Sequence, residues 1–223
     1  NDKYAIAIAK YDMVIDGVLV KGFPRGACAV FIGDTFEDSE CVHFGGFHDK
    51  FDNDTQNDSK KIKENNQVAK LSVKYSGSMM MLSAFEHGGR TYIVLSAKNS
   101  SCNRYTEAFF KVLMGRFLNA EPLEFLEALK KIIKERLTLA FELVTDQDSL
   151  GHHGAKNFKG CRMPILIAAL MYPIAESRII LKNEEVVTIA KMMGLPYARN
   201  YIPYKHTNMS DFIDGLNYLR SDI

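Results

Sequence analysis

The 223-residue chain lacks the features that mark membrane-spanning, secreted and disulfide-stapled proteins. Its longest apolar run, Met163–Tyr172, is interrupted by Pro164 and is much shorter than the roughly 20 residues that cross a bilayer. No signal peptide opens the chain, and the four cysteines form neither a C-x-x-C pair nor a tight spacing with histidine. These absences predict an intracellular protein, in the nucleus or the cytoplasm, with reduced cysteines, no protein-built metal site and no membrane partner.

The chain also lacks charge of one sign, since its formal net charge is +1. Any surface that binds nucleic acid must therefore be a local patch. A hydrophobic content of 47% and a charged content of 25% are normal for a globular protein, and the length suits one domain covering residues 1–223. Because the first residue is Asn rather than Met, we expect the sequence to be a piece of a longer protein.

The pattern of apolar and turn residues predicts an α+β fold, a strand-rich core with helical insertions. A polar stretch, Asp49–Asn66, is interpreted as an exposed loop. Strands are predicted at Tyr4–Ile15, Gly17–Lys21, Ala27–Ile32, Gln67–Lys74, Ser78–Phe85, Thr91–Ala97, Thr138–Thr145 and Ile165–Met171. Helices are predicted at Arg104–Leu118, at Pro122–Arg136, from Glu184 with Asn183 as N-cap until Gly194 and Pro196, and at Ser210–Arg220.

The segment Val68–Leu82 carries the strongest chemical signal. Lys74 ends one apolar strand, a turn containing Gly77 follows, and a second apolar strand begins at Met79. Partial burial at such a point would disfavour the ammonium form of the lysine and make its amine a nucleophile. The glycine would let the backbone approach a phosphate. By itself, a K-x-x-G segment fits a plain hairpin with a solvent-reaching lysine equally well.

The residues around Lys74 resemble the covalent nucleotidyltransferases, which include nucleic-acid ligases and RNA-capping enzymes. Lys74-Tyr75-Ser76-Gly77 resembles the nucleophile motif K-x-[DN]-G, with Ser76 in place of Asp or Asn. Four further segments resemble motifs of the RNA-ligase branch, bacteriophage RNA ligases included, in the same order. They are Phe23-Pro24-Arg25-Gly26, Lys50-Phe51-Asp52-Asn53, Ser96-Ala97-Lys98-Asn99-Ser100 and Phe141-Glu142-Leu143-Val144. The run Glu142–Thr145, followed by Leu150–Gly154, is most similar to the ligase domain of plant-type tRNA ligases.

This resemblance implies a covalent nucleotidyltransferase fold with antiparallel sheets, and an ATP- and Mg²⁺-dependent RNA ligase that joins RNA ends in tRNA splicing or RNA repair. Lys74 would take AMP from ATP as a phosphoramidate, and the AMP would pass to the 5′-phosphate of the RNA. The nucleotide would be held by Arg25, Lys50, Phe51, Asn53, Gly77, Lys98 and Glu142. Ligases of this type usually carry kinase and phosphodiesterase domains too, so such domains are expected as fused partners.

Two departures from the family pattern leave other functions open. Ser76 cannot supply the usual carboxylate or amide, and the later E-G-x-V and K-x-K motifs do not occur before Ile223. We therefore expect a fragment that stops short of those motifs. The alternatives are a non-catalytic RNA- or nucleotide-binding module of the same fold, and an RNA-capping guanylyltransferase that uses GTP.

Individual residues also have plainer interpretations. Arg25, Lys50, Asn53 and Lys98 fit turn, loop or strand-end positions in solvent, and Glu142 could point outward from a half-buried strand. From that half-exposed position we expect Glu142→Ala to leave the melting temperature nearly unchanged. His152 and His153 are predicted to read a terminal phosphate of the RNA, or else to be ordinary loop histidines.

Overall fold

The computed structural model describes residues 3–8, 12–15, 18–21, 25–35, 37–47, 69–75, 77–145, 162–171 and 179–204. The chain divides into two compact units. Unit 1 contains Asn1–Asp49 and Tyr75–Tyr197, and unit 2 contains Lys50–Lys74 and Ala198–Ile223. The α+β composition and the antiparallel sheets predicted from the sequence are confirmed. No described helix combines the length and the apolar character needed to span a membrane.

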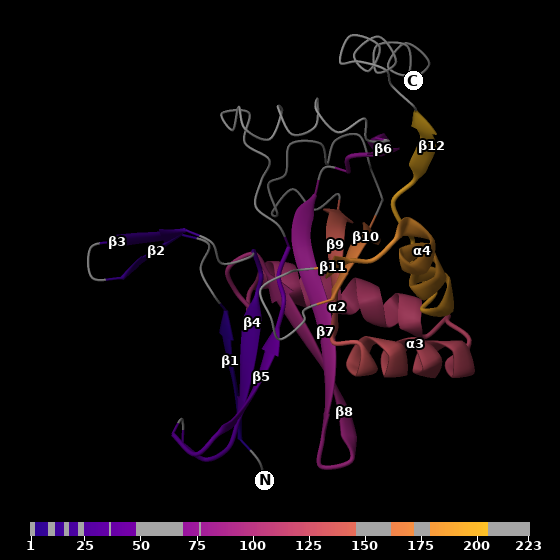
Figure 1. Ribbon diagram of the computed structural model, residues 1–223. Coiled ribbons are helices and arrows are strands. Elements are labelled where there is room, and N and C mark those ends of the chain that lie inside the picture. The colour runs from indigo at the N-terminus through magenta and orange to yellow at the C-terminus, as the bar shows by residue number, and fades with distance from the viewer. Residues whose placement is uncertain are drawn as a thin grey trace. The chain divides into compact units, whose positions relative to one another are not determined.

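Unit 1 is built on an antiparallel sheet of five strands in the order β11-β10-β9-β7-β8 (Figure 1). Their bounds are β7 Ser78–His87, β8 Arg90–Ala97, β9 Leu137–Thr145, β10 Arg162–Met171 and β11 Ile179–Ile180. A two-residue turn joins β7 to β8, with Gly88 at φ 55° and Gly89 at φ 72°. Positive φ at both central residues matches the natural twist of a hairpin, which is why two glycines occur there.

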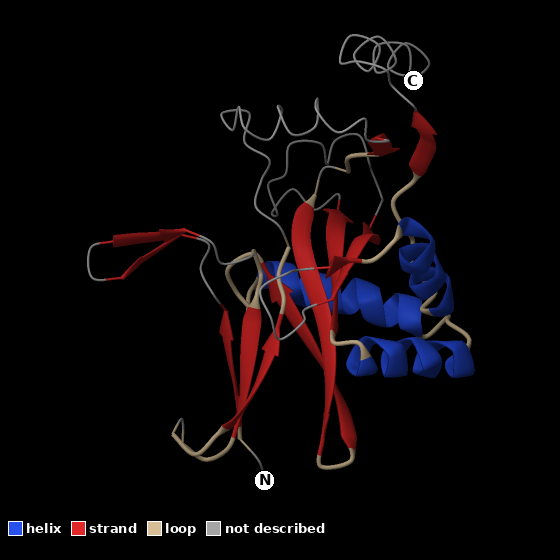
Figure 2. Ribbon diagram, viewed as in Figure 1, coloured by secondary structure: helices blue, strands red, loops and turns tan. Residues whose placement is uncertain are grey.

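Three helices cover one face of this sheet, as Figure 2 shows in blue. They are α2 Arg104–Phe117, α3 Pro122–Lys134 and α4 Asn183–Met192. Asn103 caps α2 by accepting hydrogen bonds from the backbone of Tyr105 and Thr106, and Pro122 begins α3, where a missing N–H costs nothing. The predicted N-cap Asn183 is wrong by one residue, because the N-cap of α4 is Lys182.

The largest hydrophobic core lies between the helices and the sheet. It joins alternate residues of β7 and β9, such as Leu82, Leu139 and Phe141, to residues of all three helices. The rings of Phe109 on α2 and Phe141 on β9 have their centroids 5.1 Å apart. Because side chains alternate along a strand, every second residue of β7 and β9 lies on the face away from the helices and takes no part in this core.

A smaller sheet of unit 1 has the strand order β1-β4-β5. Its strands are β1 Tyr4–Ile8, β4 Cys28–Ile32 and β5 Glu40–Phe44, and a separate hairpin is formed by β2 Asp12–Ile15 and β3 Val18–Lys21. Residues of β4 and β5 pack against Phe85 and Val94 of the larger sheet. The single strand predicted for Tyr4–Ile15 is wrong, since β1 and β2 belong to different sheets.

Unit 2 contains the antiparallel pair β6 Ala69–Ser72 and β12 Asn200–Tyr204. β6 lies within the strand predicted at Gln67–Lys74, whereas β5, β11 and β12 were not predicted from the sequence. The polar stretch Asp49–Asn66 and the helix predicted at Ser210–Arg220 lie outside the described residues.

Candidate functional site

Three of the predicted motifs meet at one end of the five-stranded sheet. The antiparallel register pairs Ser78, at the start of β7, with Leu143 near the end of β9. It also pairs Met80 with Ala97, the last residue of β8. Gly77, Glu142 and Lys98 therefore belong to the same end of the sheet, although they are far apart in the sequence.

A hydrogen bond joins two of these motifs directly. The backbone N–H of Gly77 donates to Oε1 of Glu142 at 2.8 Å, across 65 residues of sequence. Gly77 is buried and Glu142 is half-buried. A charge-assisted hydrogen bond of this kind holds Gly77 against β9. The structure thus brings Gly77, the last residue of the K-x-x-G segment, to the F-E segment.

The geometry also gives the reason for glycine at position 77. A Cβ built on Gly77 would lie 2.4 Å from the carbonyl oxygen of Leu143, so no side chain fits. The expectation that this glycine makes room for a phosphate is not what the geometry shows, because the atoms next to it belong to β9. Glycine is needed here so that the turn can approach the strand.

The Arg25-Gly26 segment is attached to the end of β8. The N–H of Gly26 donates to the carbonyl of Lys98 at 3.2 Å, and the buried hydroxyl of Ser96 donates to the carbonyl of Gly26 at 3.0 Å. Gly26 has φ +77°, and a Cβ there would lie 3.0 Å from the side chain of Met81. Both the left-handed backbone and the contact with Met81 favour glycine.

Arg25 lies half-buried beside Phe47. Their backbones exchange two hydrogen bonds, of 2.9 and 2.8 Å, and the guanidinium carbon lies 5.4 Å from the centroid of the phenyl ring. This cation–π contact holds an arginine at the sheet end where Lys98 also lies, exposed to solvent. A permanent cation in this position suits the neutralisation of phosphate.

Cys28, the first residue of β4, has a buried and unreactive thiol. Burial raises the pKa of its thiol to about 12, and a hydrogen bond with Ser96 offsets this only in part. The thiol therefore stays protonated near neutral pH and is not a nucleophile.

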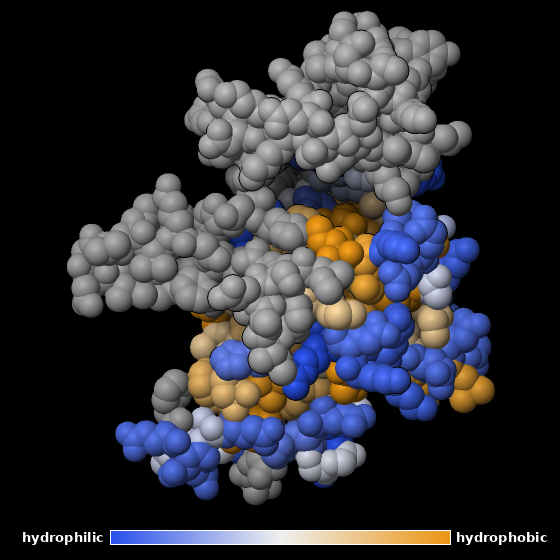
Figure 3. All heavy atoms as spheres, in the orientation of Figure 1, coloured by the Kyte–Doolittle hydropathy of each residue, from blue (hydrophilic) through white to orange (hydrophobic). Residues whose placement is uncertain are grey.

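The sheet face opposite the helices carries a second, buried apolar cluster beside Glu142. Met81, Ala140 and Ala168 lie in a row across β7, β9 and β10, and Phe47 and Met79 pack against them. Glu142 pairs with Met79, so its side chain starts on this same face. In Figure 3 hydrophobic residues, coloured orange, gather around β9 and β10.

These residues fit a nucleotide in the chemistry of their groups. The carboxylate of Glu142 can accept hydrogen bonds from ribose hydroxyls, and the arginine and lysine suit phosphate. Within the described ranges, no three His, Cys, Asp or Glu side chains gather as a group that could hold a metal ion.

Lys74 lies in a different unit from Gly77 and Glu142: it is the last residue of the first stretch of unit 2. Its side chain is exposed rather than partly buried as predicted. The remaining predicted residues, together with Ser76, lie outside the described residues: Lys50, Phe51, Asn53, His152 and His153.

Sequence reasoning missed Phe47 and Met81 as members of this site. Phe47 follows two buried glycines, Gly45 and Gly46, and that glycine pair was the only local signal of a close approach. Met81 was assigned to core filling, and it does pack in a cluster, but on the face that carries Glu142 rather than under the helices. The chain matches no protein-family model, and no curated protein sequence matches it either.

Proposed function

We propose that this chain is the adenylyltransferase domain of an ATP-dependent RNA ligase of the tRNA-ligase type, with Lys74 as nucleophile. The observation that carries the proposal is the 2.8 Å hydrogen bond from Gly77 to Glu142. It joins Gly77 of the K-x-x-G segment to Glu142 of the F-E segment, and both segments resemble motifs of the same enzyme family.

The chemistry at Lys74 is a phosphoryl transfer. Its Nζ, after giving up a proton to water, attacks the α-phosphorus of ATP; an N–P bond forms while the P–O bond to pyrophosphate breaks and pyrophosphate leaves with the electron pair. An oxygen of the 5′-phosphate of an RNA end then attacks the same phosphorus, which breaks the N–P bond and returns the amine to Lys74. Finally a 3′-hydroxyl attacks the 5′-phosphorus, AMP leaves, and the hydroxyl proton goes to solvent. Such transfers need in-line positioning and charge neutralisation more than covalent assistance from further residues.

Arg25 and Lys98 supply positive charge in this scheme, together with Lys50. Both Arg25 and Lys98 are anchored through backbone hydrogen bonds at the end of the sheet, which fits groups that position phosphates. Magnesium, when bound with the nucleotide, supplies further neutralisation of the phosphate oxygens. Phe51 and Asn53 complete the nucleotide contacts, and His152 and His153 contact the terminal phosphate of the RNA.

Glu142 has two tasks in this proposal. Its Oε1 holds the Gly77 N–H, and the carboxylate orients the ribose of the nucleotide. The first task links Glu142 to the nucleophile motif. The carboxylate holds Gly77, which lies three residues after Lys74 in the sequence. Catalysis by positioning is sensitive to displacements of about 1 Å, so the loss of this contact would lower the rate of adenylation.

Lys74→Ala tests the proposal. The protein is incubated with magnesium and either α-labelled ATP or α-labelled GTP, and the product is examined by denaturing gel and intact mass. We expect label from ATP and a mass increase equal to AMP in the unchanged protein, and neither in Lys74→Ala. Because Lys74 is exposed, its replacement should leave stability within about 0.5 kcal/mol.

Lys111→Ala is the matched control, since Lys111 is an exposed lysine on α2. It should label as strongly as the unchanged protein. Label from GTP alone would identify a capping-type guanylyltransferase instead. An adduct that maps to another lysine, such as Lys98, would reject Lys74 as the nucleophile. No label from either nucleotide would reject the ligase proposal and favour a non-catalytic binding module.

A further inference from the structure

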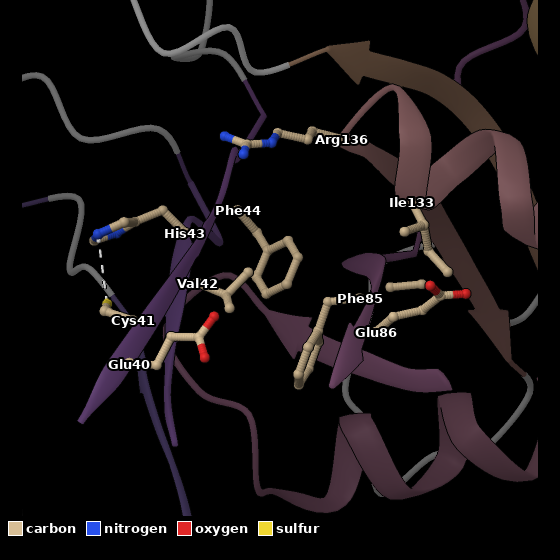
Figure 4. A pocket seen from close by; sticks show the side chains of 10 residues that line it. Glu40, Cys41, Val42, His43, Phe44, Phe85, Glu86, Ile133 and Arg136 are labelled. Atoms are coloured by element: carbon tan, nitrogen blue, oxygen red, sulfur yellow. Dashed lines mark hydrogen bonds between the residues drawn. The ribbon is translucent and has the colours of Figure 1, made fainter. Parts of the chain in front are cut away.

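A cavity of about 610 Å³ lies in unit 1, away from the Gly77–Glu142 end of the sheet. It is lined by all five residues of β5, Glu40–Phe44, by the consecutive residues Ala84–Glu86 of β7, and by Ile133 and Arg136 where α3 gives way to β9 (Figure 4). Its volume lies in the range of roughly 300–1,000 Å³ typical of ligand sites.

Consecutive lining residues mean that both strands present their edges to the cavity. Side chains of a strand alternate between its two faces, so a cavity against one face would be lined by every second residue. Here five residues in a row on β5 and three in a row on β7 contribute. The cavity therefore runs along the backbone of both strands.

Both edges are open within the described part of the chain. β5 is the last strand of its sheet and pairs with β4 alone. β7 pairs with β9 only as far as Ser83, so Ala84–Glu86 pair with β8 on one side and have no paired strand on the other among the described residues. Backbone N–H and C=O groups along an open edge form a template for one more strand.

We propose that this cavity binds an extended peptide segment of a partner protein, which adds to β5 as a fourth strand of the smaller sheet. Strand addition satisfies backbone hydrogen bonds along the edge, and alternate side chains of the peptide then enter pockets. β5, with five residues, has the usual length of a strand in a sheet. The proposal does not depend on the proposed ligase activity.

The side chains around the cavity define the sequence that fits. Phe44 and Phe85 lie at its centre, with ring centroids 6.0 Å apart, and form an apolar floor together with Val42. Figure 4 shows the carboxylates of Glu40 and Glu86 to either side of these rings, and Arg136 above them. Two carboxylates against one guanidinium favour a peptide in which apolar residues alternate with lysine or arginine.

Arg136 directly follows the C-cap of α3 and has φ 51°, a left-handed conformation that commonly ends a helix. This helix ending places Arg136 at the rim of the cavity. Nδ1 of His87 lies 3.6 Å from Oε2 of Glu40, so an imidazole lies beside one of the two carboxylates.

The test uses the whole 223-residue chain and a fluorescent nine-residue peptide of alternating valine and lysine. Anisotropy gives the dissociation constant, and hydrogen exchange reports on the amides of Glu40–Phe44. We expect saturable binding with slowed exchange in β5. Two further peptides carry N-methyl groups on all valine nitrogens or on all lysine nitrogens. One of them should lose binding, because one alternate set of amides faces β5.

Glu86→Lys should weaken binding by about tenfold or more, because it sets a cation against the lysines of the peptide. Glu107→Lys, with the same charge change on an exposed residue of α2, is the matched control and should bind normally. If the charge reversal in Glu86→Lys unfolds the protein, Glu86→Gln is used instead, and we expect it to lose less affinity for the peptide. Equal binding by both methylated peptides, or unchanged β5 exchange, would overturn the proposal. The proposal would also be overturned if, without peptide, hydrogen exchange in β5 slowed as the protein concentration rose. That result would identify a second copy of the chain as the occupant.

Discussion

The two faces of the five-stranded sheet use the same strands for different purposes. On β9, Leu139, Phe141 and Leu143 face the helices and are 1% exposed or less. Between them, Thr138, Ala140 and Glu142 face the other way and include two polar groups. The helix-covered face is filled with large apolar side chains, whereas the opposite face carries small and hydrogen-bonding ones.

This difference shows how a small fold separates stability from chemistry. Large side chains packed to high density make the helix face intolerant of change. On the other face, the half-buried carboxylate of Glu142 leaves a polar group within reach of a ligand. The helix face is therefore expected to govern unfolding, and the opposite face to govern nucleotide transfer.

The largest expected effect is on the helix face. Phe141→Ala removes a fully buried ring that packs edge-on against Phe109, so we expect a loss of about 3–5 kcal/mol in the free energy of unfolding. Urea denaturation followed by circular dichroism measures it. A loss below about 1.5 kcal/mol would mean that the helix face is not the main source of stability.

Gly77→Ala is expected to come next, on the face that carries the site. The added Cβ would lie 2.4 Å from the Leu143 carbonyl, so the turn after Lys74 must shift. We expect a destabilisation of about 1–3 kcal/mol together with loss of AMP transfer. Gly115→Ala is the control, because no atom lies within 4 Å of the new Cβ in α2. It should stabilise the protein by up to about 1 kcal/mol. Similar effects of the two substitutions would refute the close approach at Gly77.

Substitutions of Glu142 are expected to change stability no more than Gly77→Ala does, and they separate the two tasks of this carboxylate. Glu142→Ala leaves the buried N–H of Gly77 without its acceptor, which should cost about 1–3 kcal/mol. This replaces the expectation, from its half-exposed position alone, that the melting temperature would hardly change. Glu142→Gln keeps an oxygen acceptor and should retain more of the stability. If the carboxylate also orients the ribose, the KM for ATP should rise in both variants. A normal KM in Glu142→Gln would restrict Glu142 to holding the turn.

Local pattern was enough to predict most of the regular structure. The apolar spacing in α2 and α3, the proline at the start of α3 and the double glycine between β7 and β8 each act over a few residues, so the sequence reveals them. β5, β11 and β12 escaped prediction, because short strands depend on partners distant in the sequence more than on their own residues.

The sequence by itself determined the α+β class, the helices around the large sheet and the candidate residues Lys74, Gly77 and Glu142. Only the tertiary structure decided that Gly77 is bonded to Glu142, that Gly26 is anchored to Lys98, and that β5 ends its sheet beside a cavity. Strand register is the physical reason. It is set by pairing between segments far apart in the sequence, such as Gly77 and Glu142 across 65 residues, and by which face each side chain takes, and the neighbouring residues determine neither.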